Sequence, residues 1–157
     1  MDRSTRDQLL ARYKEGYRVV ADALQGATDP ELDARPAPGK WNAREIVHHL
    51  ADSEMTSVVR LRLLLAEDHA QIRPYDQDLF ARTLHYDRPI STSLLAFEAA
   101  RLSNAELLDR LSETEWGKKG THPEHGVFGV ERWLEIYAAH AHKHADQIRR
   151  ARASART

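Results

Sequence analysis

Three histidines stand close together near the carboxyl end of the chain. His140, His142 and His144 lie within the stretch from Val130 to Ile148, whose apolar residues recur every three or four positions, the period of a helix. On a helix, His140 and His144 lie one turn apart on an apolar face, whereas His142 points towards water. Neutral imidazoles in an apolar stripe need partners for their ring nitrogens, and a divalent metal suits histidines at this spacing. Partly buried structural histidines are the alternative.

A metal bound by this helix needs a further ligand from another part of the chain. The segment from Asn42 to Glu67 opens with a capping-box pattern and has helical period. At about 100° per residue, His49 lies at the edge of its apolar stripe, whereas His48 lies nearly opposite and is expected to be solvated. Glu54 falls inside the stripe and must have a partner, for which an arginine or a lysine from a neighbouring helix is preferred to a metal.

Composition excludes several classes of protein and of site. The chain has 157 residues, which we interpret as one domain spanning residues 1–157, and its 23 basic and 24 acidic residues give a net charge of −1. That balance argues against binding to nucleic acid or to an anionic membrane surface. There is no cysteine, so any metal must be held by His, Asp or Glu. With no apolar signal region and no run of about 18 apolar residues, we expect a cytoplasmic protein.

The elements that must position the histidines are all helical, and the pattern predicts an all-α four-helix bundle. A short helix is expected within Asp76–Leu84, and another turn near Asp29, but no strand is indicated. Because every connection between the main helices is long, the sequence leaves their up-and-down order open. Ser91 or Thr92 is expected to cap the third helix, with Leu95 and Leu102 among its buried residues. The main helices are predicted at Thr5–Gln25, Asn42–Glu67, Ser91–Leu111 and Val130–Ile148, with irregular segments at Ala70–Pro89 and Ser112–Gly129.

The order of these motifs resembles that of the DinB/YfiT superfamily of metal-binding four-helix bundles. The segment K-W-N-A-R-E-I-V-H-H-L-A-D-S-E is followed far downstream by H-A-H-K-H-A-D-Q-I, and R-P-Y-D and H-P-E are similar to the YfiT branch. The resemblance implies one divalent ion per chain, zinc or nickel, bound by three histidines, and a homodimer. YfiT-like chains often have His where this chain has Glu54. The matching positions are Trp41, His49, Leu50, Glu54, His140, His144 and Gln147.

Further residues are assigned candidate roles around this three-histidine group. Gln147 is expected to orient a metal ligand. Glu54 and His122 are the candidates for a general base, and His125 lies in the same Gly/Pro-rich loop as His122. The polar edge of the second helix, together with the R-P-Y-D loop, is expected to form a substrate wall. The candidate substrate-binding residues on this wall are Arg60, Arg73 and Tyr75.

Three neutral imidazoles would leave a metal with open positions and its full charge. A water bound there has its pKa lowered towards neutrality, which favours a metal-dependent hydrolase acting on a small-molecule substrate. The open position could instead hold the thiolate of a small thiol, as in the bacillithiol-like S-transferases of the superfamily. A metal that only stabilises the bundle is the third hypothesis, although structural zinc sites are usually closed by four protein ligands.

Overall fold

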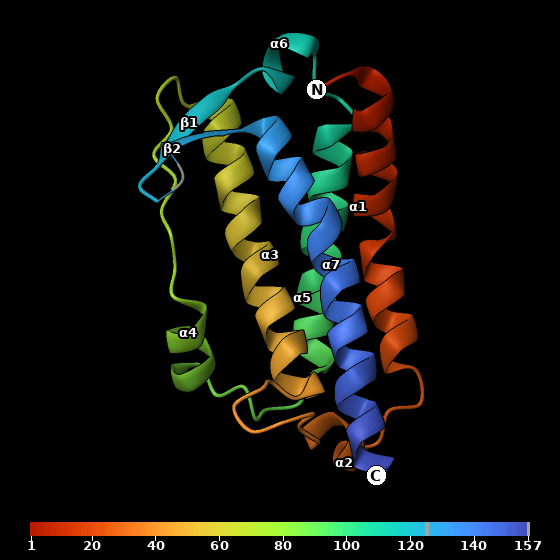
Figure 1. Cartoon of the computed structure of the whole chain (residues 1–157). Helices are drawn as coiled ribbons and strands as arrows, with labels where there is room; N and C mark the ends of the chain where they lie inside the picture. The colour runs from red at the N-terminus through yellow and green to blue at the C-terminus, as the bar shows by residue number, and fades with distance from the viewer. Residues whose placement is uncertain (125, 157) are drawn as a thin grey trace.

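Four long helices lie side by side in the computed structural model, which describes residues 1–124 and 126–156 (Figure 1). They confirm the predicted four-helix bundle. The helices α1 and α7 run in one direction, and α3 and α5 run in the opposite direction (Figure 1). Consecutive helices α3 and α5 are therefore parallel, which requires a connection long enough to return along the bundle. The bounds are α1 Arg3–Leu24, α3 Ala43–Ala66, α5 Ser91–Leu108 and α7 Val130–Ala153.

Local capping signals explain most of the helix starts. Asn42 accepts a hydrogen bond from the backbone N–H of Glu45, whose side chain returns to the N–H of Asn42, so the predicted capping box of α3 is confirmed. The short helix α2, Asp29–Asp33, begins with a second capping box at Thr28. The expected cap of α5 at Ser91 or Thr92 is wrong, because Ile90 precedes the helix and makes no side-chain capping bond.

The buried face of α5 differs from the one predicted. Leu95 and Leu102 are 64% and 60% exposed, so their assignment to the core is wrong. Arg101 and Asn104 are buried instead, and their side chains bond to polar groups of α1 and α3. Counting apolar side chains cannot find this face, because polar residues occupy much of it. The buried residues of α5 are Ser93, Phe97, Arg101, Asn104 and Leu108.

The two irregular segments each contain regular structure. The helix α4, Gln77–Thr83, lies within the predicted Asp76–Leu84 and is capped by Asp76. The second segment contains α6, Glu113–Trp116, followed by an antiparallel hairpin of β1, Lys119–His122, and β2, Gly126–Gly129. The expectation of no strand is therefore wrong. Strands of four residues are too short to show a clear alternation of apolar and polar side chains. The sequence pattern therefore could not predict this hairpin.

Two apolar clusters fill the bundle, with a polar layer between them. One cluster packs around Val20, Leu50 and Phe97, and the other around Leu61, Leu108 and Trp133. The intervening positions of α3 and α5 carry polar side chains that pair with one another. Within the described residues, no helix combines the length and apolar character needed to cross a membrane.

Candidate metal centre

The structure brings His49, His140 and His144 together. His49 comes from the first half of α3, and the other two lie one turn apart on α7. One nitrogen from each ring lies within 4.8 Å of the others, and these three form the one group of potential metal ligands found among the described residues.

The three rings direct the same nitrogen, Nε2, towards one point. The Nε2 atom of His140 lies 3.3 Å from that of His49 and 3.1 Å from that of His144. At the zinc–nitrogen bond length of about 2.1 Å, tetrahedral ligand nitrogens lie roughly 3.4 Å apart. A shared proton can bridge one pair of these nitrogens but not all three. The spacing therefore fits a central cation.

Neighbouring aromatic rings hold these imidazoles in place. The ring of Trp41, just before α3, lies 4.8 Å from that of His49, and the ring of Tyr137 meets His140 edge-on at 6.0 Å. Within the described residues, the Nδ1 atoms of His49 and His140 are buried without a hydrogen-bond partner. Packing therefore orients these two rings, and their Nε2 lone pairs remain available for a metal.

Burial keeps these imidazoles neutral. It lowers the pKa of His49 to about 3, with a smaller contribution from the charge of His144. It lowers the pKa of His144 to about 4 and that of His140 well below the usual value. Deprotonated nitrogens are the form that binds a metal, so the group is ready to bind one at neutral pH. The donor set therefore fits the implied ion.

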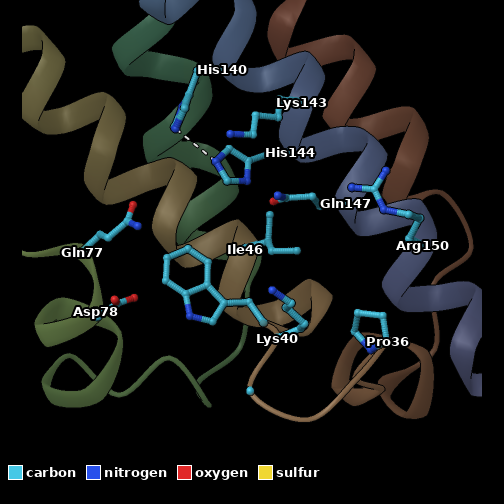
Figure 2. Close-up of a pocket in the computed structure, with 12 residues that line it drawn as sticks. Pro36, Lys40, Ile46, Gln77, Asp78, His140, Lys143, His144, Gln147 and Arg150 are labelled. Atoms are coloured by element: carbon cyan, nitrogen blue, oxygen red, sulfur yellow. Dashed lines mark hydrogen bonds between the residues drawn. The ribbon is translucent and has the colours of Figure 1, made fainter.

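A cavity of about 730 Å³ opens onto two of these histidines (Figure 2). His140 and His144 lie in its wall, with Trp41 and Ile46 as apolar neighbours. Gln147 also lines it, and its side-chain amide favours the charged form of His144, which raises that pKa against the larger effect of burial. This position is consistent with the predicted orienting role of Gln147.

His48 is buried, and the prediction that it is solvated is wrong. Its Nε2 donates a hydrogen bond to the carbonyl oxygen of Arg88 at 3.0 Å, and its Nδ1 lies 2.8 Å from the Ser93 hydroxyl. The start of α5 and the residues before it cover this face of α3, which the helical period of α3 alone could not reveal. His142 is half-buried and donates to the carbonyl oxygen of Arg12 at 3.0 Å.

Glu54 belongs to the polar layer of the core. Its carboxylate accepts hydrogen bonds from the Tyr13 hydroxyl at 2.5 Å and from Arg101 at 2.8 Å, and the side chain is fully buried. The predicted basic partner from a neighbouring helix, an arginine or a lysine, is confirmed as Arg101. Glu54 does not line the cavity, so the structure does not bring it to the open side of the histidine group.

His122 lies in the hairpin, away from the cavity lining. Its Nδ1 accepts a hydrogen bond from the backbone N–H of Glu124 at 3.2 Å, and its ring contacts Phe128. The structure thus does not bring this candidate base to the three histidines. His125 lies outside the described residues.

The three predicted substrate-binding residues contact one another instead of the cavity. Arg60 donates to the Tyr137 hydroxyl at 3.1 Å and to the carbonyl oxygen of Arg73 at 2.8 Å, and its guanidinium lies 5.8 Å from the Tyr75 ring. Burial raises the pKa of Tyr75. Tyr137 connects this cluster to the ring of His140, and the three predicted residues are absent from the cavity lining.

Sequence reasoning missed the charged residues of the cavity wall. Lys143 and Arg150 of α7 and Lys40 before α3 all line it. A signal was present, since residues 140, 143, 144, 147 and 150 follow the spacing of one helix face. The apolar residues alone indicate the buried side of this helix, and they do not reveal the polar stripe that continues beyond Gln147.

Known proteins are similar to this chain in both sequence and fold. A protein from Oceanobacillus iheyensis named "Putative metal-dependent hydrolase OB0782" is 34% identical over 131 residues, which are 83% of this chain and 76% of that protein. A relative of the same description from Halalkalibacterium halodurans is 28% identical over 77% of this chain and 71% of its own length.

The fold matches that of YfiT from Bacillus subtilis, described as a probable metal-dependent hydrolase with an unusual four-helix bundle topology. The TM-score is 0.88 at 29% identity, over 94% of this chain and 86% of that one. The family model of the DinB superfamily matches residues 12–148. With the three-histidine group and the bundle both in place, the chain belongs to the DinB superfamily.

Proposed function

We propose that this protein is a metal-dependent hydrolase acting on a small molecule. The observation that carries the proposal is the convergence of three neutral Nε2 atoms, from His49, His140 and His144, beside an open cavity. Zinc or nickel, one ion per chain, suits three imidazole ligands. The relatives named as metal-dependent hydrolases support the same reaction class.

The open side of the group favours catalysis over a purely structural metal. When bound, the ion supplies a Lewis acid that polarises a substrate carbonyl and lowers the pKa of a nucleophile. His49 closes the site from within the bundle, being 2% exposed, whereas His140 and His144 border the cavity. No fourth His, Asp or Glu joins the group among the described residues, whereas structural zinc sites usually have four protein ligands.

The surrounding residues prepare the site for substrate. Trp41 and Ile46 form an apolar wall that excludes water from one side of a bound molecule. Gln147 lies beside His144 and holds that ring in the orientation in which Nε2 faces its partners.

Metal content and turnover test the proposal directly. We expect purified protein to contain about one zinc or nickel ion per chain, and His144→Ala to lose about 10- to 100-fold or more in metal affinity, measured by competition with a chelator. His142→Ala, on the same helix but off the group, is the matched control and should retain the metal.

Hydrolysis of p-nitrophenyl esters by the metal-loaded protein then identifies the reaction. Turnover with water alone supports a hydrolase. Turnover that begins only when a small thiol is added would replace hydrolysis by thiol transfer. If neither occurs, and metal removal only lowers the melting temperature, the metal is structural and the proposal is wrong.

A further inference from the structure

A stripe of polar and cationic side chains continues along α7 beyond the histidines. Lys143, Gln147 and Arg150 lie on the cavity side of the helix with His140 and His144 (Figure 2). Lys40 faces them from the segment before α3, so three cations line one cavity. Asp78 of α4 is the carboxylate in this wall. The wall therefore has a net positive charge.

Lys143 is placed where its charge opposes metal binding. It directly precedes His144, and its side chain lies beside that ring in the cavity (Figure 2). An ammonium group near a divalent ion raises the energy of the bound ion, and an anion bound in the same cavity offsets part of that repulsion. A lysine that served only the metal site would be unfavourable here. Its position is explained if the molecule entering the cavity is negatively charged.

Arginines on the other faces of α7 are engaged within the fold. Arg149 donates to Asp146 at 2.8 Å, and Arg152 forms an ion pair with Glu31 at 3.2 Å. In contrast, Lys143 and Arg150 form no ion pair with any residue in the described part of the chain. Their charges are available to a ligand in the cavity.

We propose, building on the proposed function, that the substrate carries an oxyanion held by Lys143 and Arg150. Arg150 is six residues beyond His144, which is roughly 9 Å along the helix axis. An anion at the Arg150 end of the cavity therefore lies up to that distance from the reacting bond, which sits at the histidine group. Between the two ends, Trp41 and Ile46 offer an apolar surface. The substrate class is a small amphiphilic acid with its scissile bond remote from its charge.

Three probes that differ only in the group at the far end of an alkyl chain test this arrangement without relying on turnover. Octanoate, suberate and phosphonooctanoate share one carboxylate and an alkyl chain, and their far ends are a methyl, a carboxylate and a phosphonate. Binding to the zinc-loaded protein is measured by calorimetry. We expect suberate to bind about tenfold more tightly than octanoate, as two charge-assisted contacts would give. Tighter binding of phosphonooctanoate than of suberate supports a phosphate-type anion, and the reverse order supports a carboxylate.

Matched variants identify the residues responsible. The double variant Lys143→Gln/Arg150→Gln should bind suberate and octanoate equally, while Arg149→Gln, which changes a cation on another face, should keep the preference. Zinc content and the helical circular dichroism spectrum should equal those of the wild type. If the double variant does not fold, the two single variants provide the same test. Each is expected to lose roughly threefold of the preference for suberate over octanoate.

Two results would overturn the inference: equal affinity of the wild type for suberate and octanoate, or an equal loss of preference in Arg149→Gln. These are distinct from failure of the proposed function. A protein that prefers suberate but hydrolyses no ester leaves the anion site intact and removes the hydrolase proposal. A protein that hydrolyses neutral esters but does not prefer anions supports the hydrolase proposal and removes the anion site.

Discussion

At the scale of single residues, the metal group depends on histidines that resist protonation. Three imidazoles with strongly lowered pKa values lie in contact with one another, and their common cause is burial. This burial costs stability in acid, because the unfolded chain takes up protons that the folded chain does not. The same property keeps the nitrogens free for a metal at neutral pH.

The metal-free protein should lose stability as the pH falls from about 6.5, the usual pKa of His, towards the folded values of about 3 for His49 and about 4 for His144. In this window the unfolded state binds more protons than the folded state, so each group contributes a slope of up to about 1.4 kcal/mol per pH unit. Urea unfolding at several pH values measures this slope.

The variant His140→Asn removes one titrating group, so the free energy of unfolding should depend less steeply on pH. His142, half-buried and outside the group, provides the comparison: His142→Asn should leave the slope unchanged. A free energy of unfolding that stays constant between pH 6.5 and 4.5 would contradict the prediction.

At the scale of the elements, a buried ion pair and the hydrogen bonds of its arginine join all four long helices. Arg101 of α5 contacts Glu54 of α3, and its Nη2 also donates to the carbonyl oxygen of Tyr13 on α1. Gly16 makes this possible, because a Cβ there would lie 2.4 Å from the Arg101 guanidinium nitrogen. Nη2 of Arg101 also donates to the carbonyl oxygen of Tyr137 on α7 at 3.4 Å, so these contacts link the two helices that carry the histidines.

Breaking this pair should destabilise the bundle strongly. Arg101→Met leaves the Glu54 carboxylate buried without its cation, and we expect a loss of about 3–5 kcal/mol in the free energy of unfolding. Adding Glu54→Leu should recover part of it, because the unpaired charge is then removed. Equal stabilities of the single and double variants would show that the pair is not coupled.

The variant Glu54→Gln also tests the sequence-derived role of Glu54 as a general base. Its carboxylate is engaged with Tyr13 and Arg101 in the core, so we expect folded Glu54→Gln to keep its metal content and most of its esterase activity. A large fall in kcat with full metal occupancy would instead support the catalytic role.

At the scale of the whole molecule, we propose a homodimer. The tyrosines of the long connection between α3 and α5 are not free surface residues, since Tyr86 is buried and Tyr75 is half-buried. Four of the exposed large apolar side chains lie together on the adjacent helices α3 and α5, namely Met55, Val59, Leu95 and Leu102. Multi-angle light scattering at micromolar concentration should give twice the 17.9 kDa chain mass, and a monomer would refute the proposal.

The sequence by itself determined the four long helices, the three histidines and the need of Glu54 for a basic partner. Helical period and spacing are local properties, and they place His140 and His144 on one face wherever the helix packs. Only the tertiary structure decided the direction of each helix, the buried state of His48 and the polar face of α5. These depend on which helix covers which face, and long connections leave that choice to packing. The cationic cavity wall is likewise a tertiary feature, because its residues come from α7, α4 and the segment before α3.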